Sequence, residues 1–533
     1  FFVIFIALGF GSNSEAKNTT QDFEQAKNNF FKKEWAKAKN QLLAIKNKAS
    51  NSKVGKRSSF LLALLYIQSS KNKQAIEILT PLIKIYPEIQ DYILLNLAKA
   101  ELQNKNFEQA QSHIVKLLKK FPETQLYPEA KMILSETYSQ NDFDNKAAEI
   151  FQETITTLES STYHKNFRSY TPEFIFKLAL NQERLGRKSE AYFNYRQLYI
   201  KYPNHERTAD SKTAIKKLIA SHGIKEVPLN LEEHTERIGQ LFKGVRYKEI
   251  IAEISKIKKD NNPMPGRFYF FLSNAHRGLR DRKKANIALK EFSKLYPQHL
   301  QIDKAKFNIG RNLWNLGKPL AGAKYFKEVS ENNTLSERAI KALFFLGKIY
   351  EERKNYSESL KLYKKALEKY PESFYGQWAG WRLGWINYID GKFGKAFERF
   401  QEVAKRFPNG PFIEYNLYWA AKSAEKIGDK KKAKEIFINV AKLYPYTFHG
   451  IRAKEQMIKQ GIVFSEPSRE NSAFKNPLKL ARPLDHREKF HHIRAKELSM
   501  VGLNEEARNE IQQLEKSIQK NLTGVLWLSK LYH

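Results

Sequence analysis

The sequence of 533 residues contains no cysteine, which excludes disulfides, thiolate metal sites and cysteine nucleophiles. Proline (18 residues) and glycine (24 residues) are sparse, which favours long helices over a turn-rich β protein. No run of residues is long and apolar enough to cross a membrane. With 41% hydrophobic residues, the chain still has enough apolar side chains to fold, and its length suits several domains or one extended repeat array.

The first residues form a short apolar run, Phe1 to Phe10, which is followed by small residues at Ser14 and Ala16. This pattern predicts a secretory signal over residues 1–16 that is cleaved after Ala16, and it favours that interpretation over a buried strand. Neither a methionine nor a basic segment precedes the run, so we expect the sequence to be truncated at its start. The pattern predicts an exported, periplasmic protein with no transmembrane segment after the signal is removed.

A repeated pattern surrounds seven prolines that each follow a tyrosine or phenylalanine. These are Pro87, Pro122, Pro203, Pro297, Pro371, Pro408 and Pro445. Small residues stand 24 positions earlier (Ala63, Ala98, Ala179, Ser273, Gly347, Gly384, Ala421) and 12 positions earlier (Ala75, Ala110, Ala191, Ala285, Ser359, Ala396, Ala433). Large apolar residues stand 8 positions earlier (Leu79, Ile114, Tyr195, Leu289, Tyr363, Phe400, Phe437). From Pro297 to Pro445 the period is 37 residues, with Thr334 in place of one proline.

This pattern predicts pairs of amphipathic helices joined by short polar turns. Small residues at two columns allow the paired helices to approach closely, and the large residue fills the adjacent groove. Proline marks the end of each pair because it cannot continue a helix interior. Since no pair can bury its apolar face alone, we expect an all-α solenoid or superhelix of stacked helical hairpins with a period of about 37 residues.

The pattern divides the chain into six segments. They are the signal (1–16), a first repeat array (20–221), a degenerate repeat or linker (222–262), a second array (263–460, with its best units at 340–373, 377–410 and 414–447), a linker rich in Ser, Pro and Asn (465–485), and a C-terminal helical segment (486–533). Weaker copies of the pattern lie at Ala26, Ala38 and Leu42, and at Ala495, Ala507 and Ile511.

The segment from Leu346 to Pro371, LGKIYEERKNYSESLKLYKKALEKYP, resembles the tetratricopeptide repeat, whose standard unit is about 34 residues. The resemblance covers roughly residues 20–460. It implies a helical-hairpin superhelix and says little about function, because one fold serves many functions.

A second resemblance lies at residues 374–457. The tract from Tyr418-Trp419 to Gly428 looks like the tyrosine-tryptophan helix of soluble lytic murein transglycosylases. Phe448-His449-Gly450 with Ala453, and Phe374-Tyr375-Gly376 with Ala379, look like that family's aromatic-Tyr-Gly-x-x-Ala step. Lys422 and His449 depart from the arginine and tyrosine that are usual in the family. The resemblance implies a long helical superhelix that precedes a lysozyme-like catalytic domain, in which a glutamate acts as general acid and base on the glycan.

That catalytic glutamate lies in a Glu-Ser pair followed by Gly-Leu-Met-Gln, as the resemblance implies. The chain has Glu-Ser at Glu159-Ser160, Glu358-Ser359 and Glu372-Ser373, but none is followed by that tetrapeptide and all lie within or beside repeat helices. We assign them no catalytic role. We expect the catalytic domain to follow His533, and whether the full-length protein is an enzyme stays open.

No cofactor or metal site is predicted. The adjacent His491 and His492 would diverge on a helix, so we expect ordinary surface positions. The carboxylates Glu351 and Glu352 are expected in a solvated turn between repeats.

Two features suggest ligand surfaces. The net charge of +35 favours anionic partners, although abundant lysine and asparagine also follow from an AT-rich genome. Four aromatic residues, Trp378, Trp381, Trp385 and Tyr388, could line a sugar-binding surface, although their spacing is also typical of helix packing.

Two hypotheses follow. The first is the exported helical part of a lytic transglycosylase, which positions peptidoglycan for an absent catalytic domain. The second is a non-enzymatic periplasmic scaffold for envelope proteins. In both, an anionic polymer is a possible partner, and nucleic acid is not expected because the chain is predicted to be exported.

Overall fold

The computed structural model describes residues 4–160, 163–260, 263–332, 336–464, 483–518 and 527–529. All regular structure in these ranges is helical, without a strand, so the predicted all-α fold is confirmed. The chain forms two compact units: unit 1 is Phe1–Pro228 with Asn471–His533, and unit 2 is Leu229–Glu470. No helix in the described part of the chain is long and apolar enough to span a bilayer.

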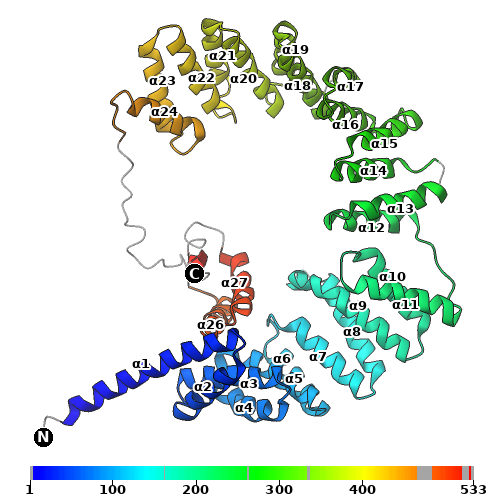
Figure 1. The fold of residues 1–533 in the computed structure, drawn as a ribbon, viewed down its shortest axis with the longest axis vertical. Coiled ribbons are helices and arrows are strands. Elements are labelled where there is room, and N and C mark those ends of the chain that lie inside the picture. The colour runs from blue at the N-terminus through cyan, green and yellow to red at the C-terminus, as the bar shows by residue number, and fades with distance from the viewer. Residues whose placement is uncertain are drawn as a thin grey trace. The chain divides into compact units, whose positions relative to one another are not determined.

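Unit 1 begins with helical hairpins that follow one another along the chain (Figure 1). Its elements are α1 (Ile4–Phe31), α2 (Trp35–Lys48), α3 (Lys53–Gln68), α4 (Asn72–Ile85), η1 (Pro87–Ile89), α5 (Gln90–Gln103), α6 (Phe107–Lys120), α7 (Tyr127–Gln140), α8 (Asp144–Ser160), η2 (Tyr163–Tyr170), α9 (Thr171–Arg184), α10 (Lys188–Lys201), α11 (Arg207–His222), α26 (His486–Val501) and α27 (Asn504–Ile518).

Unit 2 continues the same design. Its elements are α12 (Leu231–Lys243), α13 (Tyr247–Asp260), α14 (Gly266–Gly278), α15 (Arg282–Leu295), α16 (Ile302–Asn315), α17 (Pro319–Asn332), α18 (Glu337–Glu352), α19 (Tyr356–Lys369), α20 (Phe374–Ile389), α21 (Phe393–Arg406), α22 (Ile413–Lys426), α23 (Lys430–Leu443) and α24 (Phe448–Ile458). The segment predicted as a degenerate repeat or linker thus contains the helices α12 and α13.

Parts of the predicted signal, of the predicted linker and of the predicted C-terminal segment (519–526 and 530–533) lie outside the described residues. The predicted signal includes residues 1–3, which lie outside them, and from Ile4 onward the backbone is helical in α1. Residues 465–482 of the predicted linker also lie outside, and the described chain resumes at 483, just before Asp485 caps α26.

The small-residue columns lie at the crossing of each hairpin, as predicted. We call the first helix of a hairpin its A helix and the second its B helix. Ala396 and Ala433 are 0% and 2% exposed. Gly384 of the A helix α20 lies so close to Phe400 of α21 that an added methyl group would be 2.5 Å from the ring. The Ser359 hydroxyl of α19 donates to the Gly347 carbonyl of α18 at 2.8 Å. The small residues therefore allow the backbones of each pair to approach.

In each repeat that ends at one of the seven prolines or at Thr334, the turn between the A and B helices contains one residue in the left-handed backbone region, 17 positions before that proline or threonine. These residues are Ser70, Lys105, Gly186, Arg280, Gly317, Lys354, Gly391 and Gly428. Glycine occupies this conformation without a steric penalty, whereas a residue with a Cβ does not. The sequence predicted the polar turns, but it did not predict that one residue in each turn has a positive φ.

The B helix of each hairpin packs on the A helix of the next, and successive A helices also touch one another. In unit 2, α16 contacts α18, α18 contacts α20, α20 contacts α22 and α22 contacts α24. Side chains on these helices consequently line one continuous surface, which we call the A-helix face.

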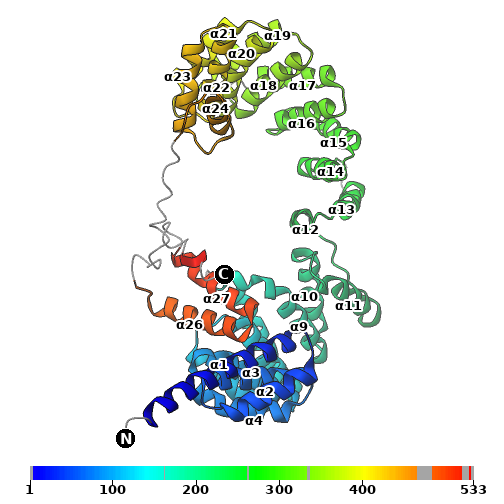
Figure 2. The ribbon, with the colours of Figure 1, turned by 60° about the vertical axis from the view of Figure 1, so that its left-hand side comes forward.

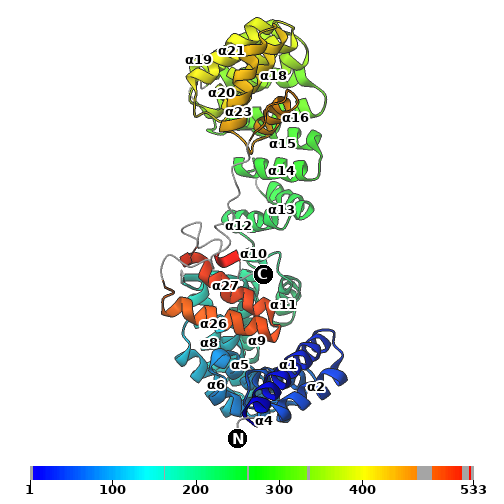
Figure 3. The ribbon, with the colours of Figure 1, turned by 90° about the vertical axis from the view of Figure 1, so that its left-hand side faces the viewer.

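The C-terminal pair α26–α27 packs on the first hairpins of unit 1, although hundreds of residues separate them in sequence (Figures 2 and 3). Helix α26 contacts η1, and Lys27 of α1 donates to the Met500 carbonyl at 3.4 Å. The weak repeat columns predicted here are buried, with Ala495, Ala507 and Ile511 each at most 5% exposed.

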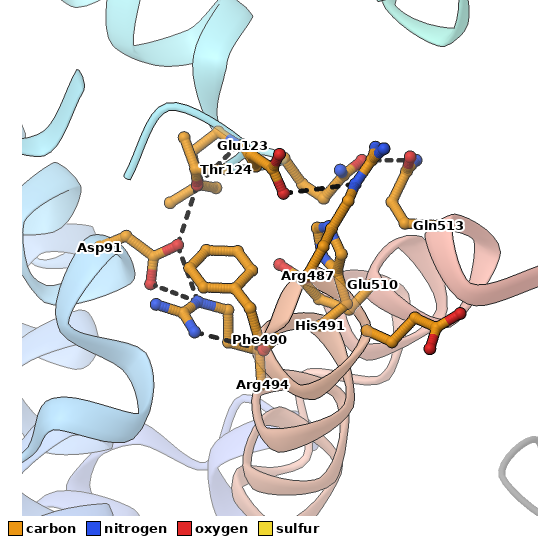
Figure 4. A network of polar contacts seen from close by, with 12 residues as sticks. Asp91, Glu123, Thr124, Arg487, Phe490, His491, Arg494, Glu510 and Gln513 are labelled. Atoms are coloured by element: carbon orange, nitrogen blue, oxygen red, sulfur yellow. Dashed lines mark hydrogen bonds and ion pairs between the residues drawn. The ribbon is translucent and has the colours of Figure 1, made fainter. Parts of the chain in front are cut away.

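A buried polar network holds this contact (Figure 4). The Arg494 guanidinium of α26 donates through Nε to both carboxylate oxygens of Asp91, at 3.1 Å each. The Thr124 hydroxyl donates to the same carboxylate at 2.9 Å. The guanidinium also lies over the rings of Phe490 and Phe121, at 3.4 and 5.2 Å from their centroids. An arginine in the interior is thus satisfied by a carboxylate and two aromatic rings.

A second carboxylate, that of Glu497, enters the same contact. Glu497 accepts hydrogen bonds from Arg57 Nε at 2.7 Å and from the Tyr86 hydroxyl at 2.6 Å. Burial opposes ionisation of Glu497, yet these two hydrogen bonds bring its pKa below the usual value. Each of these partners comes from the N-terminal hairpins, so the network fixes how α26 lies on them.

The predicted surface position is wrong for His491. It is 1% exposed, and its Nδ1 lies 2.6 Å from the Glu510 carboxylate of α27, which also accepts from the Tyr92 hydroxyl at 2.9 Å. Burial raises the pKa of Glu510. His491 is buried because its side of α26 faces the N-terminal hairpins, a contact that the local sequence does not reveal. His492 lies half-buried against the Trp527 ring, 5.3 Å between centroids.

Candidate functional site: the aromatic face of α20 and α22

The start of α20 is built from the first aromatic-Tyr-Gly-x-x-Ala step. Ser373 caps the helix, accepting from the Gly376 amide at 2.9 Å. Gly376 has no room for a methyl group, because the Tyr370 carbonyl oxygen occupies that position. Ala379 is fully buried. The motif therefore has a structural role: it brings the incoming chain tightly over the first turn of an A helix.

The second step builds the start of α24 in the same way. Thr447 caps the helix by accepting from the Gly450 amide at 3.1 Å, and the Tyr444 carbonyl leaves no space at Gly450. His449, in the position of Tyr375, is 5% exposed and packs on the Tyr415 ring with 4.3 Å between centroids. Burial lowers the pKa of His449, although Glu414 acts in the opposite direction.

Four predicted aromatic residues of α20 share the A-helix face, and all four are half-buried. Trp381 stacks on Trp385 with 5.6 Å between centroids and 15° between planes, and Trp385 stacks on Tyr388 at 6.0 Å and 13°. Trp378 stacks between Phe344 at 4.5 Å and Phe412 at 5.9 Å. The stacking covers part of each ring face and leaves the rest at the surface.

The row continues on α22, where Tyr415, Tyr418 and Trp419 are half-buried as well. Trp419 meets Trp385 and Tyr388 edge-on, at 4.7 and 5.0 Å between centroids. We call these seven residues the aromatic face: Trp378, Trp381, Trp385, Tyr388, Tyr415, Tyr418 and Trp419. The rings both join adjacent hairpins and present an extended apolar surface.

Polar groups border the aromatic face. The Arg382 guanidinium lies 5.0 Å from the Trp381 ring and donates to Glu351 at 2.9 Å. On the other side, Lys422 lies 2.5 Å from Glu425, which also accepts from Gln456 at 3.1 Å. Rings flanked by a cation, a carboxylate and an amide can bind a ligand that combines apolar faces with hydroxyl or amide groups.

The predicted solvated position is wrong for Glu351. It is 8% exposed and accepts from both Arg382 and the Tyr363 hydroxyl, the latter at 2.8 Å. The reason is that Arg382 belongs to the next hairpin and covers the turn. A sequence signal exists, since the tyrosines of the large column at 363 and 195 each follow a glutamate by 12 positions, and Tyr195 likewise donates to Glu183 at 2.6 Å. Glu352 accepts from the Trp314 indole at 2.9 Å.

The three Glu-Ser pairs lie apart from one another. Glu159 and Ser160 end α8, Glu358 lies in the first turn of α19, and Ser373 is the cap of α20. Ser359 is fully buried at a helix crossing. Each of the three serines thus belongs to a helix end, a helix cap or a helix crossing. Among the described residues, no group of three or more His, Asp or Glu side chains could hold a metal ion.

Comparison with known families agrees with this geometry. Two family models, both described as tetratricopeptide repeat, match the chain, one over residues 307–374 and the other over 173–205 and 415–445. The chain carries tetratricopeptide repeats. The matched residues 415–445 cover most of α22 and α23, so the part of the aromatic face on α22 lies on a tetratricopeptide A helix. No curated protein matches the chain.

Solved tetratricopeptide structures are similar in fold alone. PilF of Pseudomonas aeruginosa is 12% identical, with 42% of this chain and 96% of that chain covered and a TM-score of 0.31. PilW, a type IV pilus biogenesis factor, is 18% identical over 42% of this chain and 99% of its own, also with a TM-score of 0.31. A tetratricopeptide repeat protein from Parabacteroides merdae is 14% identical over 56% and 99% of the two chains, with a TM-score of 0.29.

Proposed function

We propose that the chain is a non-catalytic tetratricopeptide scaffold of the cell envelope that positions a peptidoglycan strand, as the helical part of a lytic transglycosylase does. The observation that carries this proposal is the aromatic face. Its half-exposed rings run across consecutive A helices beside the Lys422–Glu425–Gln456 cluster. Sugars offer apolar ring faces and hydroxyl groups, which match such a surface. The resemblance at residues 374–457 falls on the same helices.

A fluorescence titration tests glycan binding directly. Four of the seven tryptophans belong to the aromatic face, so occupancy should change the intrinsic emission. The probe is an oligomer of N-acetylglucosamine. We expect Trp381→Leu to weaken binding several-fold, because an aromatic stacking contact contributes about 0.5–1.5 kcal/mol. The control is Phe193→Leu, an exposed aromatic on the B helix α10. Equal affinity for the wild type and Trp381→Leu would remove the aromatic face from the proposal.

Activity and export are tested separately. Purified protein incubated with cell-wall sacculi should pellet with them and release no muropeptides, because glycoside hydrolysis needs a carboxylic acid held in a cleft with a raised pKa. Glu510 has a raised pKa, but it is fully buried in the contact between α27 and α5. Released anhydro-muropeptides would contradict a scaffold role. Fractionation of cells that express the full gene should give a periplasmic protein whose N-terminus is Lys17.

A non-enzymatic scaffold for envelope proteins is the second candidate. The tetratricopeptide matches in both units favour it, because such repeats commonly present an extended surface to a partner. The reading frame beyond His533 separates the candidates. A Glu-Ser pair followed by Gly-Leu-Met-Gln supports the transglycosylase scaffold, and another kind of sequence supports the second candidate.

A further inference from the structure

The last helix that the structure describes in unit 2, α24, and the turn before it carry a group of exposed apolar side chains. Tyr446 and Val463 are the most open of these, at 85% and 90% exposed. We call the whole group the terminal apolar face: Leu443, Tyr446, Phe448, Ile451, Ile458 and Val463. The outer face of a terminal repeat is ordinarily polar, because it meets water. Exposed apolar residues gathered at such an end therefore mark a contact surface.

The surface is open because α24 lacks a B helix. In the preceding hairpin, α23 covers the corresponding side of α22, where the Tyr418 ring lies 5.6 Å from the Phe437 ring and Ala421 is fully buried. The residues 37 positions after Tyr418 and Ala421 are Glu455 and Ile458, and both are exposed. The structure describes the chain up to residue 464 and again from residue 483, and no B helix follows α24 within these described residues.

The residue types on α24 do not suit a further repeat helix. Complete repeats have a small residue where the A and B helices cross, such as Gly384 or Ala421, whereas α24 has Ile458 at that position. A methyl group on Gly384 would already lie 2.5 Å from the Phe400 ring. Isoleucine at the equivalent position would hold a B helix too far away to pack. A B helix in the repeat geometry is therefore not the occupant of this surface.

Cations border the apolar side of α24. Its apolar residues follow one another at helical spacing: Phe448, Ile451 and Ile458. By the same periodicity, Lys454 lies at one edge of this row, and Arg452 and Lys459 lie at the other. The carboxylate on this side, Glu455, is paired with Arg452 at 3.0 Å. Two copies of α24 packed face to face would bring like charges together, which is unfavourable, whereas an anionic surface would match them.

We propose that the terminal apolar face attaches the chain to a lipid bilayer that contains anionic phospholipids. The apolar side chains enter the boundary between headgroups and acyl chains, and the bordering lysines and arginine meet the headgroup phosphates. Each of these cations adds to the attraction, which weakens as added salt screens it. Attachment to a bilayer goes beyond the scaffold function proposed above and does not depend on glycan binding.

The absence of cysteine provides a direct test, because a single introduced cysteine can carry an environment-sensitive fluorophore. In the full chain, Ile451→Cys places the fluorophore on the terminal apolar face, and Phe193→Cys places it at an exposed position of α10 as the matched control. The probes are vesicles of phosphatidylcholine with phosphatidylglycerol and vesicles of phosphatidylcholine alone. We expect blue-shifted, stronger emission from residue 451 on the mixed vesicles, a much smaller change on the neutral vesicles, and no change from residue 193.

Vesicle flotation then measures the affinity of unlabelled variants. Phe448→Ser should weaken binding to the mixed vesicles about tenfold, and Phe193→Ser should leave it unchanged. Lys459→Gln should weaken binding about fivefold, whereas Lys395→Gln, at an exposed position of the B helix α21, should not. Glu455→Gln should strengthen binding severalfold because it removes a negative charge from the surface. Such a gain is not expected from a variant that has lost its fold.

Several results would overturn the proposal. These are a lack of response to the mixed vesicles, an equal response from the two labelled positions, or equal binding to neutral and mixed vesicles. Without vesicles, blue-shifted emission from residue 451 that grows with protein concentration would identify a second copy as the occupant. The same emission at every concentration would show that the chain covers this surface itself. Trp381→Leu should leave vesicle binding unchanged, so failure of the bilayer contact and failure of the aromatic face are distinguished.

Discussion

The buried pair between Arg494 and Asp91 gives the sharpest stability prediction. Asp91 is fully buried and accepts from Arg494 at 3.1 Å and from Thr124 at 2.9 Å. The substitution Arg494→Met keeps an unbranched apolar stem but removes the guanidinium, and it leaves the Asp91 carboxylate with the Thr124 hydroxyl as donor. Removing one partner of a buried ion pair costs about 3–5 kcal/mol. We expect the contact between α26 and the N-terminal hairpins to open about 10²- to 4 × 10³-fold more often, at about 1.4 kcal/mol per tenfold change.

The assay is hydrogen exchange with peptides from α5 and α26, because global unfolding would mix the two units. Arg487→Met is the matched control on the same helix. Its ion pair with Glu123, at 3.3 Å, is 41% and 42% exposed, and such surface pairs contribute about 1 kcal/mol or less. Adding Asp91→Asn to Arg494→Met should restore at least half of the loss, because the uncompensated charge is then gone. Unchanged protection in α26 of Arg494→Met, or equal loss in α20 of unit 2, would refute the reasoning.

Three further predictions concern unit 2. Ala396→Leu should lower the free energy of unfolding by about 1–3 kcal/mol through overpacking, and an unchanged urea midpoint of unit 2 would place this alanine away from the crossing. Lys354→Gly should raise the free energy of unfolding by about 0.5–1 kcal/mol, because Lys354 has a φ of 60° that glycine adopts without a steric penalty. Gly391→Ala, at a φ of 76°, should lower the free energy of unfolding in the same urea melts. Burial lowers the pKa of His449, so its contribution to stability is present above the ordinary histidine pKa and is lost as pH falls through the lowered value. Melts between pH 7.5 and 5 should show a smaller loss in His449→Phe than in the wild type.

The repeat columns allowed the fold to be predicted because they report contacts within one hairpin. Ala396 and Phe400 lie on one helix, and Gly384 lies on its partner. Because all three lie close together in the sequence, their residue types recur at fixed spacings that the sequence reveals. The left-handed turn column was missed since lysine and arginine occupy several of its positions, and composition there suggests only a polar loop. Sequence periodicity records which residue types recur, not the backbone angle that they adopt.

The candidate site was predicted less completely. The spacing of Trp381, Trp385 and Tyr388 placed them on one face, but did not reveal that the rings stack on one another. Glu351 was misplaced because its partner Arg382 lies in the next hairpin. His491 was misplaced because it shares the Glu510 carboxylate with Tyr92, which lies about 400 residues away in the sequence.

The docking of α26 on the N-terminal hairpins also bears on synthesis. Arg494 follows Asp91 by 403 residues, and a ribosome adds about 5–20 residues per second. Asp91 and Arg57 therefore wait roughly 20–80 s on a nascent chain before their partners emerge. During that time the surface that later receives α26 is exposed, while the rest of the N-terminal part of unit 1 and then all of unit 2 are made. Unit 1 begins folding first and is completed last, so its apolar surface is available to a chaperone for most of translation.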